Sequence, residues 1–144
     1  MDAPNETSFG DWPAGWSVVA FPHSVSLDPR LVTAISAIAT ESTLAANGSR
    51  IGDFGAVVDD PLRFGGAVMS LSDGSGEWEV LCSNVGGFAL LGAMPTVMSA
   101  VFDARSRAAL REEFELWVND RRVGIGETGL AFANDHLLPL LRRA

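Results

Sequence analysis

Two histidines and three aspartates are the residues of this chain that are best suited to catalysis. His23 follows Pro22 directly after an apolar run, and His136 lies at the predicted start of the last helix. Histidine is the commonest general base in enzymes, and a neighbouring carboxylate orients its ring. One hypothesis is therefore a small enzyme or ligand-binding protein in which a histidine pairs with an aspartate from the set Asp53, Asp59 and Asp60.

Two tryptophans near the N-terminus form a second candidate site. The stretch Asp11-Trp12-Pro13-Ala14-Gly15-Trp16 places two indole rings four residues apart around a proline. Large flat rings stack on ligands and anchor protein interfaces, but they also cap hydrophobic cores. The sequence leaves these roles open. In the enzyme hypothesis, the two tryptophans line the pocket.

The usual sequence signatures of catalysis and cofactor binding do not occur. The chain has no GxxxxGK[ST], HExxH, CxxC or GxSxG motif. The stretch from Gly124 to Gly129 matches GxGxxG by letters only, because no βαβ pattern surrounds it. Two histidines and one cysteine are few for a metal centre. We therefore expect no metal and no cofactor, and enzyme activity is the less favoured interpretation.

The composition favours one acidic globular domain. The chain has 144 residues and a formal net charge of −8, and 47% of its residues are apolar. A chain of this length supports one core, so we expect a single domain over residues 1–144, with residues 1–15 as a loosely ordered arm. Because negative charge repels phosphate backbones, no nucleic-acid binding is expected. The single cysteine, Cys82, rules out a disulfide framework, and the acidic N-terminus is unlike a secretion signal, so the cytoplasm is the predicted compartment.

Hydrophobic periodicity indicates the elements that must position these side chains. It predicts a helix that begins after Asp28 and stops at Asn47-Gly48, and another helix over residues 106–119. A Gly-rich turn at 73–76 between two alternating runs predicts a hairpin. Strands are predicted at 17–21, 55–58, 66–71, 77–82, 88–91 and around 123–125, and a last short helix at 134–143. The order indicates an α+β fold with a mainly antiparallel sheet of about four to five short strands, packed against two to three helices.

The segment 83–102 has no charged side chain. A membrane-spanning helix needs about 20 mainly apolar residues, but three glycines and Pro95 interrupt this run, so no membrane contact is expected. The pattern instead predicts the strand at 88–91 followed by a helix from Pro95. Met94 and Met98 share one face of that helix, and adaptable methionines suit an interface. We therefore expect this segment to be mostly core, with a methionine face that contacts a partner.

The favoured function is a non-enzymatic protein-interaction module, such as an acidic inhibitor, an immunity-type protein or a secretion-chaperone-like protein. An acidic surface would steer a basic partner protein, and apolar contacts centred on Trp12, Trp16, Met94 and Met98 would hold it. Two alternatives remain open. One is the small enzyme or ligand-binding protein described above, and the other is a structural subunit of a homo-oligomer, in which a homodimer forms through the helix after Met94.

Overall fold

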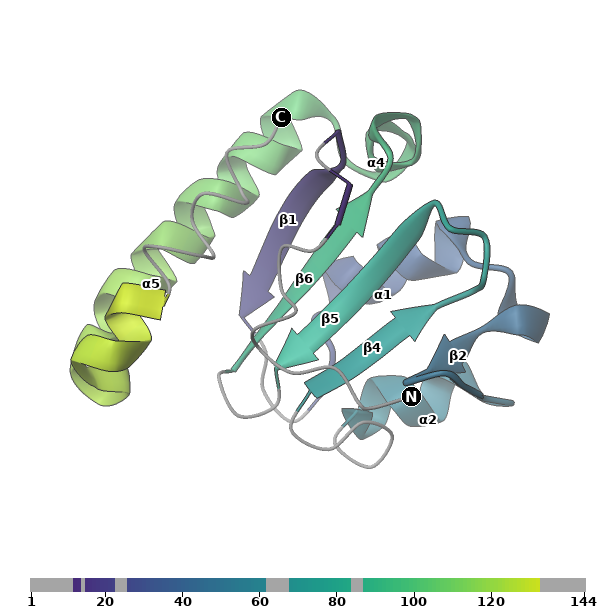
Figure 1. The fold of residues 1–144 in the computed structure, drawn as a ribbon. Helices are drawn as coiled ribbons and strands as arrows, with labels where there is room; N and C mark the ends of the chain where they lie inside the picture. Colours follow the sequence, from purple (N-terminus) through teal and green to yellow (C-terminus); the bar gives the residue numbers. More distant parts are fainter. Residues whose placement is uncertain (1–11, 14, 23–25, 62–67, 84–86, 133–144) are drawn as a thin grey trace.

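Six strands form one antiparallel sheet in the order β1-β6-β5-β4-β2-β3 (Figure 1). This computed structural model describes residues 12–13, 15–22, 26–61, 68–83 and 87–132. The strands are β1 (Ser17–Pro22), β2 (Ala45–Ala46), β3 (Ser49–Arg50), β4 (Val68–Ser72), β5 (Trp78–Ser83) and β6 (Phe88–Ala93). The helices in the described ranges are α1 (Pro29–Ile38), α2 (Phe54–Asp59), α4 (Pro95–Val101) and α5 (Ala104–Phe132), with a short 3-10 helix, η2 (Glu41–Thr43).

The two faces of the sheet bury separate hydrophobic clusters, because successive strand residues point to opposite sides. On one face, Trp78, Val80 and Cys82 of β5 pack with residues of α1, α2 and α4. On the other face, Leu81 of β5 packs with Leu90 of β6 and with residues of α5. Figure 1 shows α1 and α2 behind the sheet and α5 running beside β1. Helix residues therefore contribute to the hydrophobic clusters on both faces of the sheet.

Helix α5 connects the two clusters by passing the β1 edge of the sheet. Leu110 belongs to the cluster beneath α1 and α4, whereas Phe114 and Val118 belong to the cluster on the opposite face. Phe114 is fully buried, and its ring lies 5.2 Å from the ring of Trp117 and 6.3 Å from that of Phe88, measured between centroids. The helix thus covers a strand edge that would otherwise be open to pairing with another chain.

The structure confirms the central part of the sequence interpretation. Strands β4 and β5 form the predicted hairpin, in which Val68 pairs with Ser83 and Leu71 pairs with Val80. The uncharged segment forms strand β6 followed by helix α4, which begins at Pro95 as expected. The sheet has six strands, slightly more than the four to five expected, because β2 and β3 are only two residues long each.

The segment predicted as a strand at 55–58 is a helix. Asp53 caps α2, and its Oδ1 atom accepts a hydrogen bond from the backbone N–H of Gly55 at 2.9 Å. Val57 is fully buried and anchors this short helix to the core. A four-residue apolar run fits a helix or a strand equally well, and here the aspartate cap decides between them.

The bounds of the two main helices also differ from the prediction. Helix α1 ends at Ile38, and Asn47-Gly48 is not its stop signal but the turn between β2 and β3, with positive φ angles of 49° and 82°. Helix α5 begins earlier than residue 106, because Asp103 Oδ1 accepts the N–H of Ser106 at 2.7 Å. It continues through the strand expected around 123–125, since extending a formed helix adds one hydrogen bond per residue despite the cost of glycine.

Candidate functional site

Two adjoining hollows lie where α1, the end of α4 and the start of α5 meet. Their volumes are about 400 and 450 Å³, and both are lined by Arg30, Val101 and Phe102. We call them together the three-helix groove. Its remaining lining residues are mostly small or apolar: Thr33, Ala34, Ala37, Ala100, Ser106, Ala109, Leu110 and Glu113. Small side chains allow the backbone of a bound segment to approach closely, as alanines do between packed helices.

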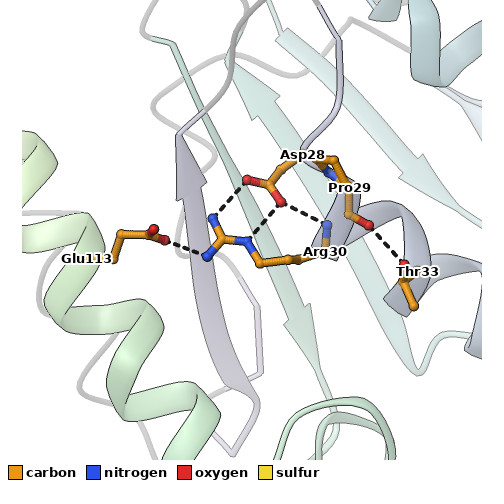
Figure 2. Close-up of polar contacts among 5 residues, drawn as sticks. All are labelled: Asp28, Pro29, Arg30, Thr33 and Glu113. Atoms are coloured by element: carbon orange, nitrogen blue, oxygen red, sulfur yellow. Dashed lines mark hydrogen bonds and ion pairs between the residues drawn. The ribbon is translucent and has the colours of Figure 1, made fainter.

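Arg30 lines both hollows, and Figure 2 shows the polar contacts that hold it. The N-cap residue of α1, Asp28, accepts two parallel hydrogen bonds from its guanidinium, at 3.0 Å from Nε and 2.9 Å from Nη2. The remaining nitrogen, Nη1, donates to Glu113 Oε2 on α5 at 2.7 Å. The guanidinium carbon also lies 5.5 Å from the centre of the Phe21 ring, within range of a cation–π contact. The arginine is therefore preorganised rather than free to rotate.

The charges around Arg30 shift its ionisation and that of its partner. Hydrogen bonding to Asp28 is the main cause that raises the pKa of Arg30 above its ordinary value, so the guanidinium stays charged. Burial alone would raise the pKa of Asp28, but the hydrogen bonds and the charge of Arg30 outweigh it and lower that pKa. Within the described ranges both ion pairs are made by Arg30, so the Arg111–Glu115 pair that helical spacing suggests is not formed.

A pH experiment tests this ion-pair arrangement. A carboxyl group whose pKa is lowered on folding stabilises the fold above its unfolded value of about 3.9 and loses that contribution as the pH falls through the folded value. Arg30→Gln removes the charge and the guanidinium hydrogen bonds that help to lower the pKa of Asp28, and it leaves the backbone hydrogen bond from residue 30 in place. We expect the loss of unfolding free energy between pH 7 and pH 3, measured by urea denaturation, to be smaller in Arg30→Gln than in the unmodified chain. Arg111→Gln, which changes neither ion pair, should keep the full loss, and an equal loss in Arg30→Gln would contradict the assignment.

The side of α5 that borders the groove continues as an exposed apolar and acidic strip. Ala109 and Glu113 line the groove, and Leu116 follows one turn later on the same side of the helix. The side chain of Glu113 is 49% exposed, and Leu116 is 64% exposed. Leu116 and Met94 are the large apolar residues that the described part of the chain exposes.

The four interaction residues predicted from the sequence lie in different environments. Met98 is fully buried in the core, whereas Met94, at the start of α4, is 38% exposed. The expectation that the two methionines share an interacting face does not fit this burial, because the turn of α4 points Met98 inward. Trp12 and Trp16 are half-buried, and their ring centroids are 6.2 Å apart. Trp12 packs against the sheet cluster beneath α5.

The predicted catalytic residues do not form a cluster in the described part of the chain. Asp53, Asp59 and Asp60 are exposed at the two ends of α2, where Asp53 is the N-cap and Asp60 the C-cap. His23 and His136 lie outside the described residues, so their predicted pairing with these aspartates stays a prediction. Within the described ranges, no three histidine, cysteine, aspartate or glutamate side chains come together as ligands for a metal ion. Burial raises the pKa of the Cys82 thiol to about 12.

The groove residues are absent from the sequence-based candidates. Arg30 and Glu113 are 83 positions apart, and only the passage of α5 along β1 brings them together. The sequence contained one indication of this surface. Leu116 lies outside the apolar stripe of its own helix, so it is not part of the core.

Comparison with known proteins finds no matching family model, no matching curated protein and no matching solved structure. In the part of the chain that is described, no helix combines the length and the apolar character needed to cross a membrane.

Proposed function

We propose that this chain is a non-enzymatic protein-interaction module that binds a segment of a partner protein in the three-helix groove. The observation that carries the proposal is the pair of adjoining hollows around one preorganised arginine. Arginine is enriched at the centres of protein interfaces, and a side chain that is already ordered loses little entropy on binding. The exposed Leu116 extends the apolar contact area along α5.

The partner segment that fits the groove best is basic. Arg30 and Glu113 line the groove with one charge of each sign, and Asp28, which is bound to Arg30, adds a second negative charge beside it. Glu113 uses only its Oε2 atom for Arg30, so its Oε1 atom is open to a lysine or arginine of the partner. The net charge of −8 steers a basic protein towards the chain and keeps acidic ones away.

Site-specific crosslinking tests the groove directly. A photo-crosslinking amino acid at position 37, an exposed groove position, should form an adduct with the partner in cells of the source organism. The same amino acid at Ser75, in the exposed β4–β5 turn, should not form it. Mass spectrometry then identifies both the protein and the segment in the adduct. Adducts at position 75 with none at position 37 would contradict the proposal.

A matched pair of substitutions measures the contribution of the groove. Ala37→Trp fills it from an exposed position and should weaken binding of the identified partner at least about tenfold, with little effect on folding. Ser75→Trp should leave the affinity unchanged. The association rate should also fall as salt increases, since attraction between opposite charges is screened. Equal affinities for the two variants would place the interface elsewhere.

A further inference from the structure

A second binding feature lies on the opposite face of the sheet, away from the three-helix groove. Trp12 lies flat over Gly92 of β6, and a β-carbon added at Gly92 would be only 2.6 Å from the Cδ2 and Cζ3 atoms of the indole. Any other residue at this position would push the ring away. The glycine therefore forms the floor of a slot that is shaped for a flat ring.

One wall of the slot recognises the indole N–H. Trp12 Nε1 donates to Glu79 Oε1 at 2.7 Å, a length typical of a bond to a charged acceptor. Glu79 pairs with Gly92 across β5 and β6, so the carboxylate stands directly beside the glycine floor. Its other oxygen, Oε2, accepts the hydroxyl of Ser70 at 2.8 Å. Asn47 Oδ1 in turn accepts the backbone N–H of Ser70 at 2.7 Å, which fixes the strand that carries the serine.

This arrangement is more selective than covering the sheet requires. An apolar side chain at position 79 would shield the face with no desolvation cost, whereas a half-buried carboxylate is costly unless donors satisfy it. The two oxygens of Glu79 are satisfied by two separate donors, and one of them is the indole. The combination of a glycine floor and an oriented carboxylate matches a flat ring with a single N–H donor.

Trp12 lies outside the backbone ladder of the sheet. It precedes β1 and joins it through a turn in which the N–H of Trp16 bonds the carbonyl of Pro13 at 3.0 Å. The ladder between β1 and β6 begins only at Ser17 and Ala93. The ring is half-buried, and it is held by one side-chain hydrogen bond together with its packing on the sheet cluster and on Trp16.

We propose that Ser70, Glu79 and Gly92 form an indole-binding slot, which the chain fills with its own Trp12 and which a tryptophan side chain of a partner protein occupies by displacing Trp12. The tethered Trp12 acts as a competitor that restricts the slot to partners presenting an indole. This proposal is independent of the three-helix groove, because it rests on the opposite face of the sheet.

Fluorine NMR of the full chain labelled with 5-fluorotryptophan tests the displacement. The four tryptophan signals are assigned by single Trp→Phe substitutions, and N-acetyltryptophanamide serves as the probe. We expect the probe to shift the Trp12 signal towards a solvent-exposed position while that of the buried Trp78 stays constant. The analogue methylated at the indole nitrogen, which lacks the donor, should leave Trp12 in place. An unmoved Trp12 signal with the unmethylated probe, or equal shifts with both compounds, would overturn the proposal.

Variants of the slot give a second readout. Trp12→Ala should bind the probe at least about tenfold more tightly than the unmodified chain, because the tethered competitor is gone. Adding Glu79→Gln to the Trp12→Ala variant should weaken its binding of the probe about tenfold. In the unmodified chain, Gly92→Ala should expel Trp12 without any probe, whereas Gly15→Ala, which has open space around it, should not. If Trp12→Ala does not fold, the Gly92→Ala and Gly15→Ala spectra decide, and a Trp12 signal unchanged by Gly92→Ala would refute the slot.

Discussion

Replacing Phe114 by alanine is expected to lower the free energy of unfolding by about 3–5 kcal/mol, measured by urea or guanidinium denaturation. The side chain is fully buried, and it packs against Phe88 on the sheet and against Trp117 on its own helix. Its removal leaves a cavity at the point where α5 attaches to the outer face of the sheet. Because a small domain is stable by only about 5–15 kcal/mol, the loss is a large part of the total.

Leu116→Ala on the same helix provides the matched control. It truncates a smaller apolar side chain at a position that is 64% exposed, so its effect on stability should stay within about 0.5 kcal/mol. Comparing the two variants distinguishes the stability that comes from packing of α5 on the sheet from the stability that comes from the helical propensity of α5. A loss at Phe114→Ala as small as that at Leu116→Ala would mean that α5 is not fixed to the sheet in solution.

Replacing Met98 by aspartate should be comparably damaging. Met98 is the fully buried residue of α4, and an aspartate there would be a charge without a partner, which costs about 3–5 kcal/mol. Met94→Asp, four residues earlier at a position that is 38% exposed, should change stability by less than about 1 kcal/mol. Denaturation curves of the two variants check the difference. If both variants keep the stability of the unmodified chain, Met98 is accessible and the core assignment fails.

The sequence predicts most accurately those elements whose signals are local. The Gly-rich turn at 73–76 and the break before Pro95 each lie between two apolar runs, and the β4–β5 hairpin, β6 and α4 form where these signals predict them. The Asp28-Pro29 pair likewise marks the true start of α1. In each case a backbone preference and the hydrophobic pattern agree, so tertiary packing has nothing to override.

The errors occur where one signal has two structural uses. Asn-Gly can stop a helix, but it is also the preferred two-residue hairpin turn, and Asn47-Gly48 serves as the latter. The run 55–58 is too short for its periodicity to distinguish a strand from one helical turn. Around Gly124 the glycines suggest a break, yet the helix continues. Local helix or strand propensity is weak evidence for a segment that is stabilised mainly by packing against neighbouring elements.

The three-helix groove is not predictable from spacing alone. Its boundary residue, Arg30, has one carboxylate partner two residues away, Asp28, but the other, Glu113 on α5, is far away in the sequence. The slot for Trp12 depends in the same way on strand register, because Glu79 is opposite Gly92 only when β5 and β6 pair as they do. Sequence analysis identified Trp12 as a residue of interest, but not the site that it fills.

The pairing of β1 with β6 also has a consequence for how the chain is made. Among the strands that the structure describes, Ser17–Pro22 pairs with Phe88–Ala93 alone, and Phe88–Ala93 comes last of them in the chain. A ribosome adds roughly 5–20 residues per second, so the apolar β1 emerges several seconds before its partner exists. During that interval the unpaired strand can aggregate or bind a chaperone. Strands β4, β5 and β6 can form their local hairpins before β1 pairs. Slow synthesis between residues 22 and 93 is therefore expected to lower the soluble yield of this protein.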